Sequence, residues 1–192
     1  MSRPLAVAIT GGIGAGKSEA LAAFARHGAA TVSSDEIVHE LLRSDEVKRV
    51  VVERLGNGVV APNGLLDRGA IGSVVFDDAE ALAWLESLLH PLVSAEYLHW
   101  RERLAALPEP PQVCVTEVPL LYETGAETRF DKVVVVTAPP KLRRSRSEFV
   151  DREHRLMPDS EKVGRADYAF TNAGSLEELD EFVRSVMDDL TR

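Results

Sequence analysis

Short apolar runs alternate along the chain with longer amphipathic segments. The runs have the length and the nearly unbroken apolar character of strands buried in a sheet, and they comprise Leu5–Ile9, Ala29–Val32, Gln112–Thr116, Lys132–Thr137 and Tyr168–Thr171. The intervening segments are mostly helical in pattern. This order predicts an α/β fold in which helices cover both faces of a five-stranded parallel sheet, giving three layers.

The longest part without a strand pattern follows Pro62. Asp78–Leu107 is almost entirely helical in pattern, and His90-Pro91 predicts an interruption because proline cannot donate a helical hydrogen bond. We therefore expect residues 62–107 to form a helical lobe inserted into the sheet domain. The sequence Pro108-Glu109-Pro110-Pro111 predicts a stiff bend that returns the chain to the sheet.

A glycine-rich sequence directly follows the first apolar run. Gly11–Ser18 matches G-x-x-x-x-G-K-[ST], and the helix-forming sequence Ala20–Ala25 comes next. In this context successive backbone N–H groups point into one concavity, and the start of the helix adds further donors. The pattern predicts a P-loop NTPase fold whose nucleotide contacts are Gly12, Ile13, Gly14, Ala15, Gly16, Lys17, Ser18 and Glu19.

Two side chains of this loop have expected roles in binding Mg-ATP. Lys17 can reach the β- and γ-phosphates, and the Ser18 hydroxyl can hold Mg²⁺. We therefore expect ATP and Mg²⁺ as the cofactors.

Acids follow two further strands, at the sheet edge where ligands bind in such folds. Asp35 could orient or deprotonate an acceptor hydroxyl, or hold Mg²⁺, although Ser34 or Asp35 would also serve as a helix N-cap. Glu117 could be a second magnesium-side carboxylate, but many strands end in acids. Parallel strands bring these acids, the glycine loop and Asn172 to one edge, which favours function.

Basic residues are concentrated late in the otherwise acidic chain, at Lys141, Arg143, Arg144, Arg146, Arg152 and Arg155. We expect residues 141–160 to form a lid segment, with Arg146 or Arg152 stabilising the charge of the transferring phosphoryl group. The alternative is a solvated helix face on which Glu148, Asp151 and Glu153 pair with the arginines.

Composition limits the possible partners. The 192-residue chain has a net charge of −9, which argues against general binding to nucleic acid or an anionic membrane. Its single cysteine, Cys114, excludes an internal disulfide and favours a reducing cytosol. Leu5–Ile9 is too short for a signal peptide or a membrane span, so we expect a cytoplasmic protein. The sequence does not indicate an oligomeric state.

The order of these motifs resembles the dephospho-CoA kinase family along nearly the whole chain. The matching pieces are Thr10–Ser18, Ser34–Leu42, Gly64–Arg68, Leu85–Pro91, Val118–Glu123, Ala166–Tyr168 and Thr171–Gly174. The His-Pro and Pro-Leu-Leu-Tyr-Glu pieces are more specific than the glycine loop, which many families share.

The resemblance implies ATP-dependent phosphorylation of the ribose 3′-hydroxyl of dephospho-coenzyme A, the final step of coenzyme A synthesis. It implies that Asp35 lies near the acceptor hydroxyl and that Arg68, His90 and Leu120 belong to the substrate site. It also implies that Asn172 lies beside the adenine ring. From the residue pattern alone, His90 would instead be a structural partner of Pro91 in breaking a helix.

Three positions depart from the family pattern. Ser33 replaces the first acid of Asp-x-Asp, and Glu19 follows the loop serine, where its charge must point away from the phosphates or pair with an arginine. The lid is short, and residues 152–156 lack the expected isoleucine and glutamine. Two alternatives therefore stay open: a kinase for another small metabolite such as a nucleoside monophosphate, and a non-catalytic ATP- or CoA-binding relative.

Overall fold

The computed structural model describes residues 3–146 and 156–192. The chain forms two compact units, which we name the sheet unit (Met1–Ser34 with Trp100–Arg192) and the helical unit (Asp35–His99). Among the described residues, no helix combines the length and the apolar character needed to cross a membrane.

The sheet unit holds five parallel strands in the order β2-β3-β1-β4-β5. In chain order its elements are β1 (Leu5–Thr10), α1 (Lys17–Arg26), β2 (Ala30–Ser33), β3 (Val113–Glu117), η2 (Ala126–Arg129), β4 (Lys132–Thr137), α6 (Pro140–Arg146), α7 (Asp159–Arg165), β5 (Tyr168–Thr171) and α8 (Leu176–Leu190). The five-stranded parallel sheet expected from the apolar runs is confirmed.

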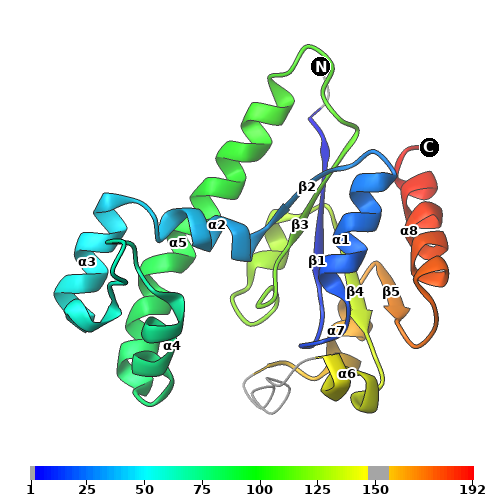
Figure 1. The fold of residues 1–192 in the computed structure, drawn as a ribbon. Helices are drawn as coiled ribbons and strands as arrows, with labels where there is room; N and C mark the ends of the chain where they lie inside the picture. The colour runs from blue at the N-terminus through cyan, green and yellow to red at the C-terminus, as the bar shows by residue number, and fades with distance from the viewer. Residues whose placement is uncertain (1–2, 147–155) are drawn as a thin grey trace. The chain divides into compact units, whose positions relative to one another are not determined.

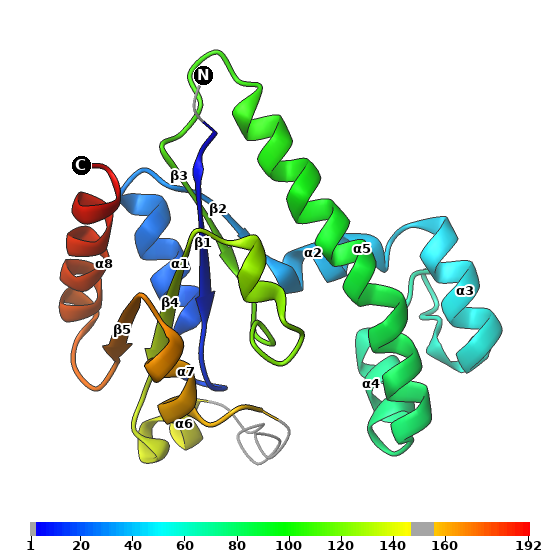
Figure 2. The ribbon, with the colours of Figure 1, turned by 180° about the vertical axis from the view of Figure 1, so that it is seen from behind.

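Alternate residues of the central strands supply two separate cores, as the two-residue period of a strand requires. Val7 and Ile9 of β1 face the core under α1 and α8, whereas Ala8 faces the opposite core. Figure 1 shows α1 and α8 side by side over the sheet, and Figure 2 shows α7 and residues 118–130 over the other face. Both faces are therefore covered.

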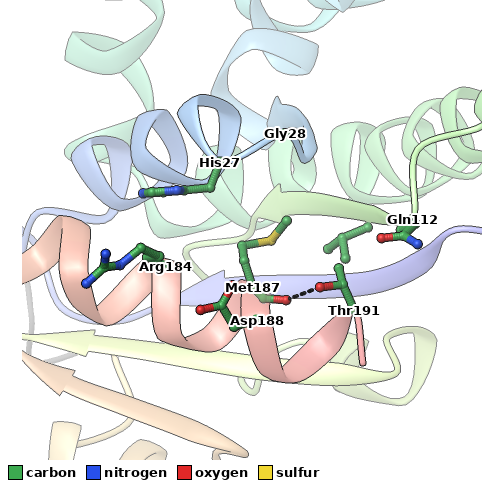
Figure 3. Close-up of a pocket in the computed structure, with 8 residues that line it drawn as sticks. His27, Gly28, Gln112, Arg184, Met187, Asp188 and Thr191 are labelled. Atoms are coloured by element: carbon green, nitrogen blue, oxygen red, sulfur yellow. Dashed lines mark hydrogen bonds between the residues drawn. The ribbon is translucent and has the colours of Figure 1, made fainter.

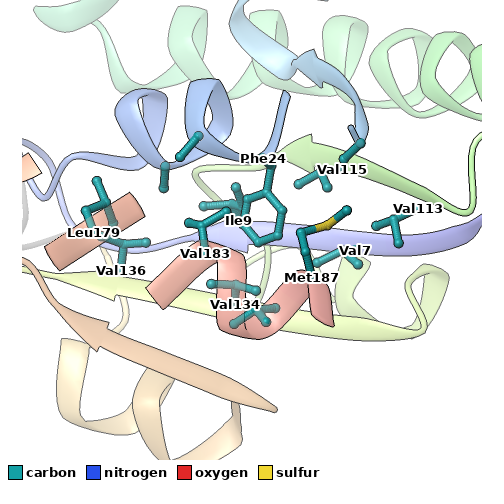
Figure 4. Packing of buried hydrophobic residues seen from close by; sticks show 14 of the residues in the cluster. Val7, Ile9, Phe24, Val113, Val115, Val134, Val136, Leu179, Val183 and Met187 are labelled. Carbon is teal, nitrogen blue, oxygen red and sulfur yellow. The ribbon is translucent and has the colours of Figure 1, made fainter. Parts of the chain in front are cut away.

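Phe24 lies at the centre of the first core. The side chain of Phe24, which belongs to α1, is fully buried among β-branched residues of the sheet and Val183 and Met187 of α8 (Figure 4). Burial of a phenylalanine contributes about 1.5–3 kcal/mol. This packing fixes α1, and with it the loop that leads into the helix.

The helical unit has a hydrophobic core of its own, formed by Leu42, Val47, Val51, Val59, Ile71, Val75, Ala81, Leu85 and Leu89. Its elements are α2 (Ser34–Leu41) from Asp35 on, α3 (Asp45–Leu55), η1 (Asn57–Val59), α4 (Arg68–Phe76) and most of α5 (Ala79–Ala105). Within Asp35–His99, where every residue is described, the only β-pairing is an isolated bridge between Val60 and Leu66. The expected lobe, residues 62–107, contains α4 and α5, and its bounds as a separate lobe stay a prediction.

Two local expectations are wrong. His90-Pro91 does not interrupt the helix, because α5 continues through Pro91 to Ala105. Buried Leu85 and Leu89 precede the proline and Leu92 packs against the same core after it, so packing holds the helix where one hydrogen bond is missing. In addition, α2 begins at Ser34, which places Ser34 and Asp35 in its first turn rather than at its N-cap.

Candidate active site

The glycine loop joins the end of β1 to the first residue of α1. Three of its glycines have positive φ angles that side-chain-bearing residues rarely adopt: 145° at Gly11, 71° at Gly14 and 99° at Gly16. Gly16 precedes α1, and no side chain caps the helix there. The start of α1 thus receives no hydrogen bond from an N-cap side chain, and its first N–H groups can serve an anion.

Two of these glycines abut the backbone of neighbouring segments. A Cβ atom on Gly11 would stand 1.9 Å from the Val136 carbonyl oxygen of β4, and one on Gly14 would stand 2.8 Å from the Arg143 carbonyl oxygen of α6. The loop therefore lies against the end of β4 and the middle of α6, where only glycine allows so close an approach.

The third glycine, Gly16, abuts a side chain. A Cβ atom there would stand 2.3 Å from Asn172 Nδ2, and that amide donates a hydrogen bond of 2.9 Å to the Ala15 carbonyl. Asn172 follows β5 and is 5% exposed. Arg146 Nη1, at the end of α6, lies 3.9 Å from the same Cβ position, so this arginine reaches the phosphate loop.

Lys17 folds back over the loop. Its Nζ donates a hydrogen bond of 3.0 Å to the Gly12 carbonyl, five residues earlier. The ammonium group is thereby held next to the peptide groups of the loop. An ammonium in this place can contact the phosphates that those peptide groups bind.

Ser18 and Glu117 meet at the carboxyl edge of the sheet. Ser18 Oγ donates a hydrogen bond of 3.2 Å to Glu117 Oε2, and Glu117 is 5% exposed. The register places Glu117 opposite Ile9 of β1 and Ser33 of β2. The expected proximity of Ser18 and Glu117 is confirmed, although their part in binding a metal stays a prediction.

This pair fits a magnesium ion, whose preferred ligands are oxygen atoms. Among the described residues, no group of three or more His, Cys, Asp or Glu side chains could hold a metal. A hydroxyl and one carboxylate nevertheless suit Mg²⁺, because this ion usually keeps several waters and takes further ligands from substrate phosphates.

Glu19 is directed toward the far end of α1. Its carboxylate pairs with Arg26, the last residue of that helix, at 3.2 Å, and Arg26 also binds Asp180 of α8 at 2.9 Å. The condition set by the sequence, pairing with an arginine, is met. The pair is exposed to solvent, and it keeps the Glu19 charge next to Arg26.

The structure describes only some of the basic residues of segment 141–160. Arg143 is engaged by Asp159 at 3.2 Å, which links α6 to α7. Arg146 is exposed at the end of α6 near Gly16. Arg152 and Arg155 lie outside the described residues, as do their expected partners Glu148, Asp151 and Glu153. The proposed lid therefore stays a prediction.

The expected acceptor-side residues belong mostly to the helical unit. Asp35 is exposed in the first turn of α2, Arg68 is the exposed first residue of α4, and His90 is exposed within α5. Leu120 belongs instead to the sheet unit, where it is half-buried in the loop after β3 and its carbonyl accepts a hydrogen bond from Thr124 N. Their roles toward an acceptor stay predictions.

Sequence reasoning missed a buried ion pair behind the loop after β3. Lys162 of α7 is fully buried, and its Nζ lies 2.9 Å from Glu123 Oε1. The same carboxylate oxygen accepts a hydrogen bond from Met157 N at 2.8 Å. Glu123 ends the Pro-Leu-Leu-Tyr-Glu piece, which was the available signal, but nothing in the polar sequence around Lys162 marks its burial.

A separate pocket lies at the opposite end of α1. It has a volume of about 310 Å³ and is lined by residues from the end of α1, the start of β3 and the end of α8 (Figure 3). Its polar groups include Arg184 and Asp188, whose charges are opposite. Because α1 begins at the glycine loop and ends at this pocket, the pocket is distinct from the phosphate site.

The parallel sheet, the glycine loop after its central strand and the Lys17–Ser18 helix start define a P-loop kinase-like nucleotide-binding protein. A family model described as dephospho-CoA kinase matches residues 5–178, and the chain belongs to this family.

Individual relatives agree over nearly their whole length. The chain is 36% identical to a dephospho-CoA kinase of Rhizobium meliloti, covering 96% of this chain and 97% of that protein. It is also 37% identical to a dephospho-CoA kinase of Streptomyces avermitilis, covering 97% of this chain and 94% of that protein. The crystal structure of TT1252 from Thermus thermophilus has a TM-score of 0.80 and 34% identity, with all of both chains covered.

Proposed function

We propose that this protein transfers the γ-phosphoryl group of ATP to the ribose 3′-hydroxyl of dephospho-coenzyme A. The observation that carries the proposal is the arrangement of Lys17, Ser18 and Glu117 around the glycine loop, in a member of the dephospho-CoA kinase family. The hydrogen bond from Lys17 to Gly12 supports the assignment because it keeps the ammonium beside the loop.

In the transfer, the bond between the γ-phosphorus and the β–γ bridging oxygen breaks, and ADP keeps the electron pair. A bond forms between the γ-phosphorus and the ribose 3′-oxygen, whose proton passes to Asp35 or to water. The loop amides and Lys17 bind the phosphates and orient them. Arg146 adds positive charge next to the loop, and Arg152 is the second candidate for that role.

Ser18 and Glu117 would hold Mg²⁺, and the bound ion would draw negative charge from the phosphate oxygens. Glu117 itself is suited to this because its carboxylate is nearly buried and already oriented by Ser18. Asp35 would align the acceptor hydroxyl from the first turn of α2.

The direct test measures loss of dephospho-coenzyme A and appearance of coenzyme A with ADP, in the presence and absence of Mg-ATP. We expect one ADP for each coenzyme A formed. A panel with AMP, CMP and shikimate as acceptors tests the alternative of another small-metabolite kinase. Binding of both ATP and dephospho-coenzyme A without product would instead support a non-catalytic relative.

A further inference from the structure

Asn172 contacts the phosphate loop through its side-chain amide. Nδ2 donates to the Ala15 carbonyl at 2.9 Å and would lie 2.3 Å from a Cβ atom on Gly16. The family resemblance assigns this asparagine a place beside adenine, but its amide donor is directed to the peptide between Ala15 and Gly16.

The asparagine is itself held firmly. Its backbone N–H donates a hydrogen bond of 2.7 Å to the Thr137 carbonyl at the end of β4, and the residue is 5% exposed. Two neighbouring strands, β4 and β5, thus fix its position. Ala15 is fully buried, so its carbonyl depends on a protein donor rather than on water.

We propose that Asn172 is a positioning residue for the phosphate loop. In a trans peptide the carbonyl and the following N–H point in opposite directions. By holding the Ala15 carbonyl toward β5, Asn172 turns the Gly16 N–H the other way, into the concavity of the loop. It also keeps a carbonyl oxygen, which would repel phosphate, out of that concavity.

This inference rests on the proposed function, because it assumes that the loop binds the phosphates of ATP. It differs from an adenine contact in one measurable respect. A residue that orients the loop acts on every ligand with the phosphate chain, whereas an adenine contact acts only on ligands that carry adenine.

The experiment measures the affinities of Mg-ATP, Mg-CTP and Mg-tripolyphosphate by titration calorimetry for the full chain and for Asn172→Ala. We expect the substitution to weaken all three ligands by a similar factor of about tenfold, because a buried carbonyl loses its donor. The ratio of ATP to CTP affinity then stays as in the unsubstituted protein. Weakening of ATP alone, or a changed ratio, would overturn the proposal, and so would unchanged affinities.

Matched variants separate loop positioning from general damage. Tyr168→Phe removes a hydrogen bond from the same strand, β5, on the side of α8, and should leave all three affinities unchanged. Asn172→Asp keeps the size but replaces the donor with a charged acceptor, and should weaken binding at least as much as Asn172→Ala. Circular dichroism confirms folding of each variant at the assay temperature.

Lys17→Ala distinguishes failure of this inference from failure of the proposed function. If Lys17→Ala weakens tripolyphosphate binding and Asn172→Ala does not, the phosphate site stands and the role of Asn172 is refuted. If Lys17→Ala has no effect, the phosphate site itself is misassigned.

Discussion

Lys17 is one of several residues of the site whose side chains are held in place by hydrogen bonds to neighbouring groups. Its ammonium is bound to the Gly12 carbonyl, Ser18 is bound to the Glu117 carboxylate, and Asn172 is bound to the Ala15 carbonyl. Each contact joins a residue with an expected role to the loop or to a strand end. Little reorganisation is then needed when phosphate binds, which is the condition for effective electrostatic stabilisation.

Replacing Lys17 with alanine removes the ammonium from the loop. We expect kcat to fall by about 10²–10³-fold, with little change in the unfolding midpoint, because a preorganised charge is lost without a change in the core. Lys132→Ala is the control, since Lys132 lies at the start of β4 and forms an exposed pair with Asp167. Steady-state kinetics measure both variants, and unchanged turnover of Lys17→Ala would contradict the assigned site.

Asp35→Asn keeps the size of the side chain and removes its charge. If Asp35 aligns or deprotonates the acceptor hydroxyl, kcat should fall by about 10²–10⁴-fold while ATP affinity stays nearly constant. Asp45→Asn is a matched control, because Asp45 is likewise an exposed acid in the first turn of a helix of the helical unit. Equal effects of the two substitutions on kcat would contradict a role for Asp35 toward the acceptor, because any acid in the first turn of a helix would then act in the same way.

At the scale of elements, the strands and the glycine loop were predictable because their signals are local. An apolar run such as Lys132–Thr137 must be buried wherever it lies, and the strand-loop-helix context gives the glycines their meaning. Continuity of α5 through Pro91 was not predictable, because it depends on packing of leucines on both sides. The contact between Asn172 and Ala15 joins residues far apart in sequence, and no local pattern encodes it.

The connection between β5 and α8 predicts a specific alkaline response. Tyr168 donates a hydrogen bond of 2.6 Å to Asp189, which raises the pKa of Tyr168 to about 12. In the unfolded chain a tyrosine loses its proton near pH 10. As the pH rises above about 10, deprotonation therefore stabilises the unfolded state before it affects the folded state. The hydrogen bond should therefore stabilise the fold below about pH 10 and cease to do so between about pH 10 and 12.

Urea unfolding of the unsubstituted protein and Tyr168→Phe at a series of pH values measures this response. We expect a difference in unfolding free energy of up to about 1 kcal/mol at pH 8, because the pair lies near the surface, and its disappearance by about pH 12. A difference that is independent of pH would show that the hydrogen bond to Asp189 does not control the titration.

At the scale of the whole molecule, each unit has its own core and its own set of expected ligand residues. The phosphate-side residues Lys17, Ser18 and Glu117 belong to the sheet unit, whereas Asp35, Arg68 and His90 belong to the helical unit. This division predicts that the two substrates affect different parts of the chain. The sequence indicated the helical region but could not give its bounds, because its core combines residues from several helices.

Hydrogen exchange measured by mass spectrometry tests that division. We expect Mg-ATP alone to slow exchange in Gly11–Arg26, and dephospho-coenzyme A alone to slow exchange in Asp35–His99. At a ligand concentration of a hundred times Kd, amides that exchange only through unfolding should slow by about a hundredfold. Protection by dephospho-coenzyme A confined to the sheet unit would contradict the assignment of the helical unit to the acceptor.

The different neighbours of the three loop glycines have a genetic consequence. A side chain at Gly11 or Gly14 would collide with main-chain atoms, of Val136 and Arg143, so no replacement of those residues makes room. At Gly16 the obstacle is the side chain of Asn172. A second substitution that replaces Asn172 with a smaller residue would therefore make room only for a side chain at Gly16. Rescue would be partial, because the Gly16 backbone is left-handed and the Asn172 hydrogen bond to Ala15 would be lost.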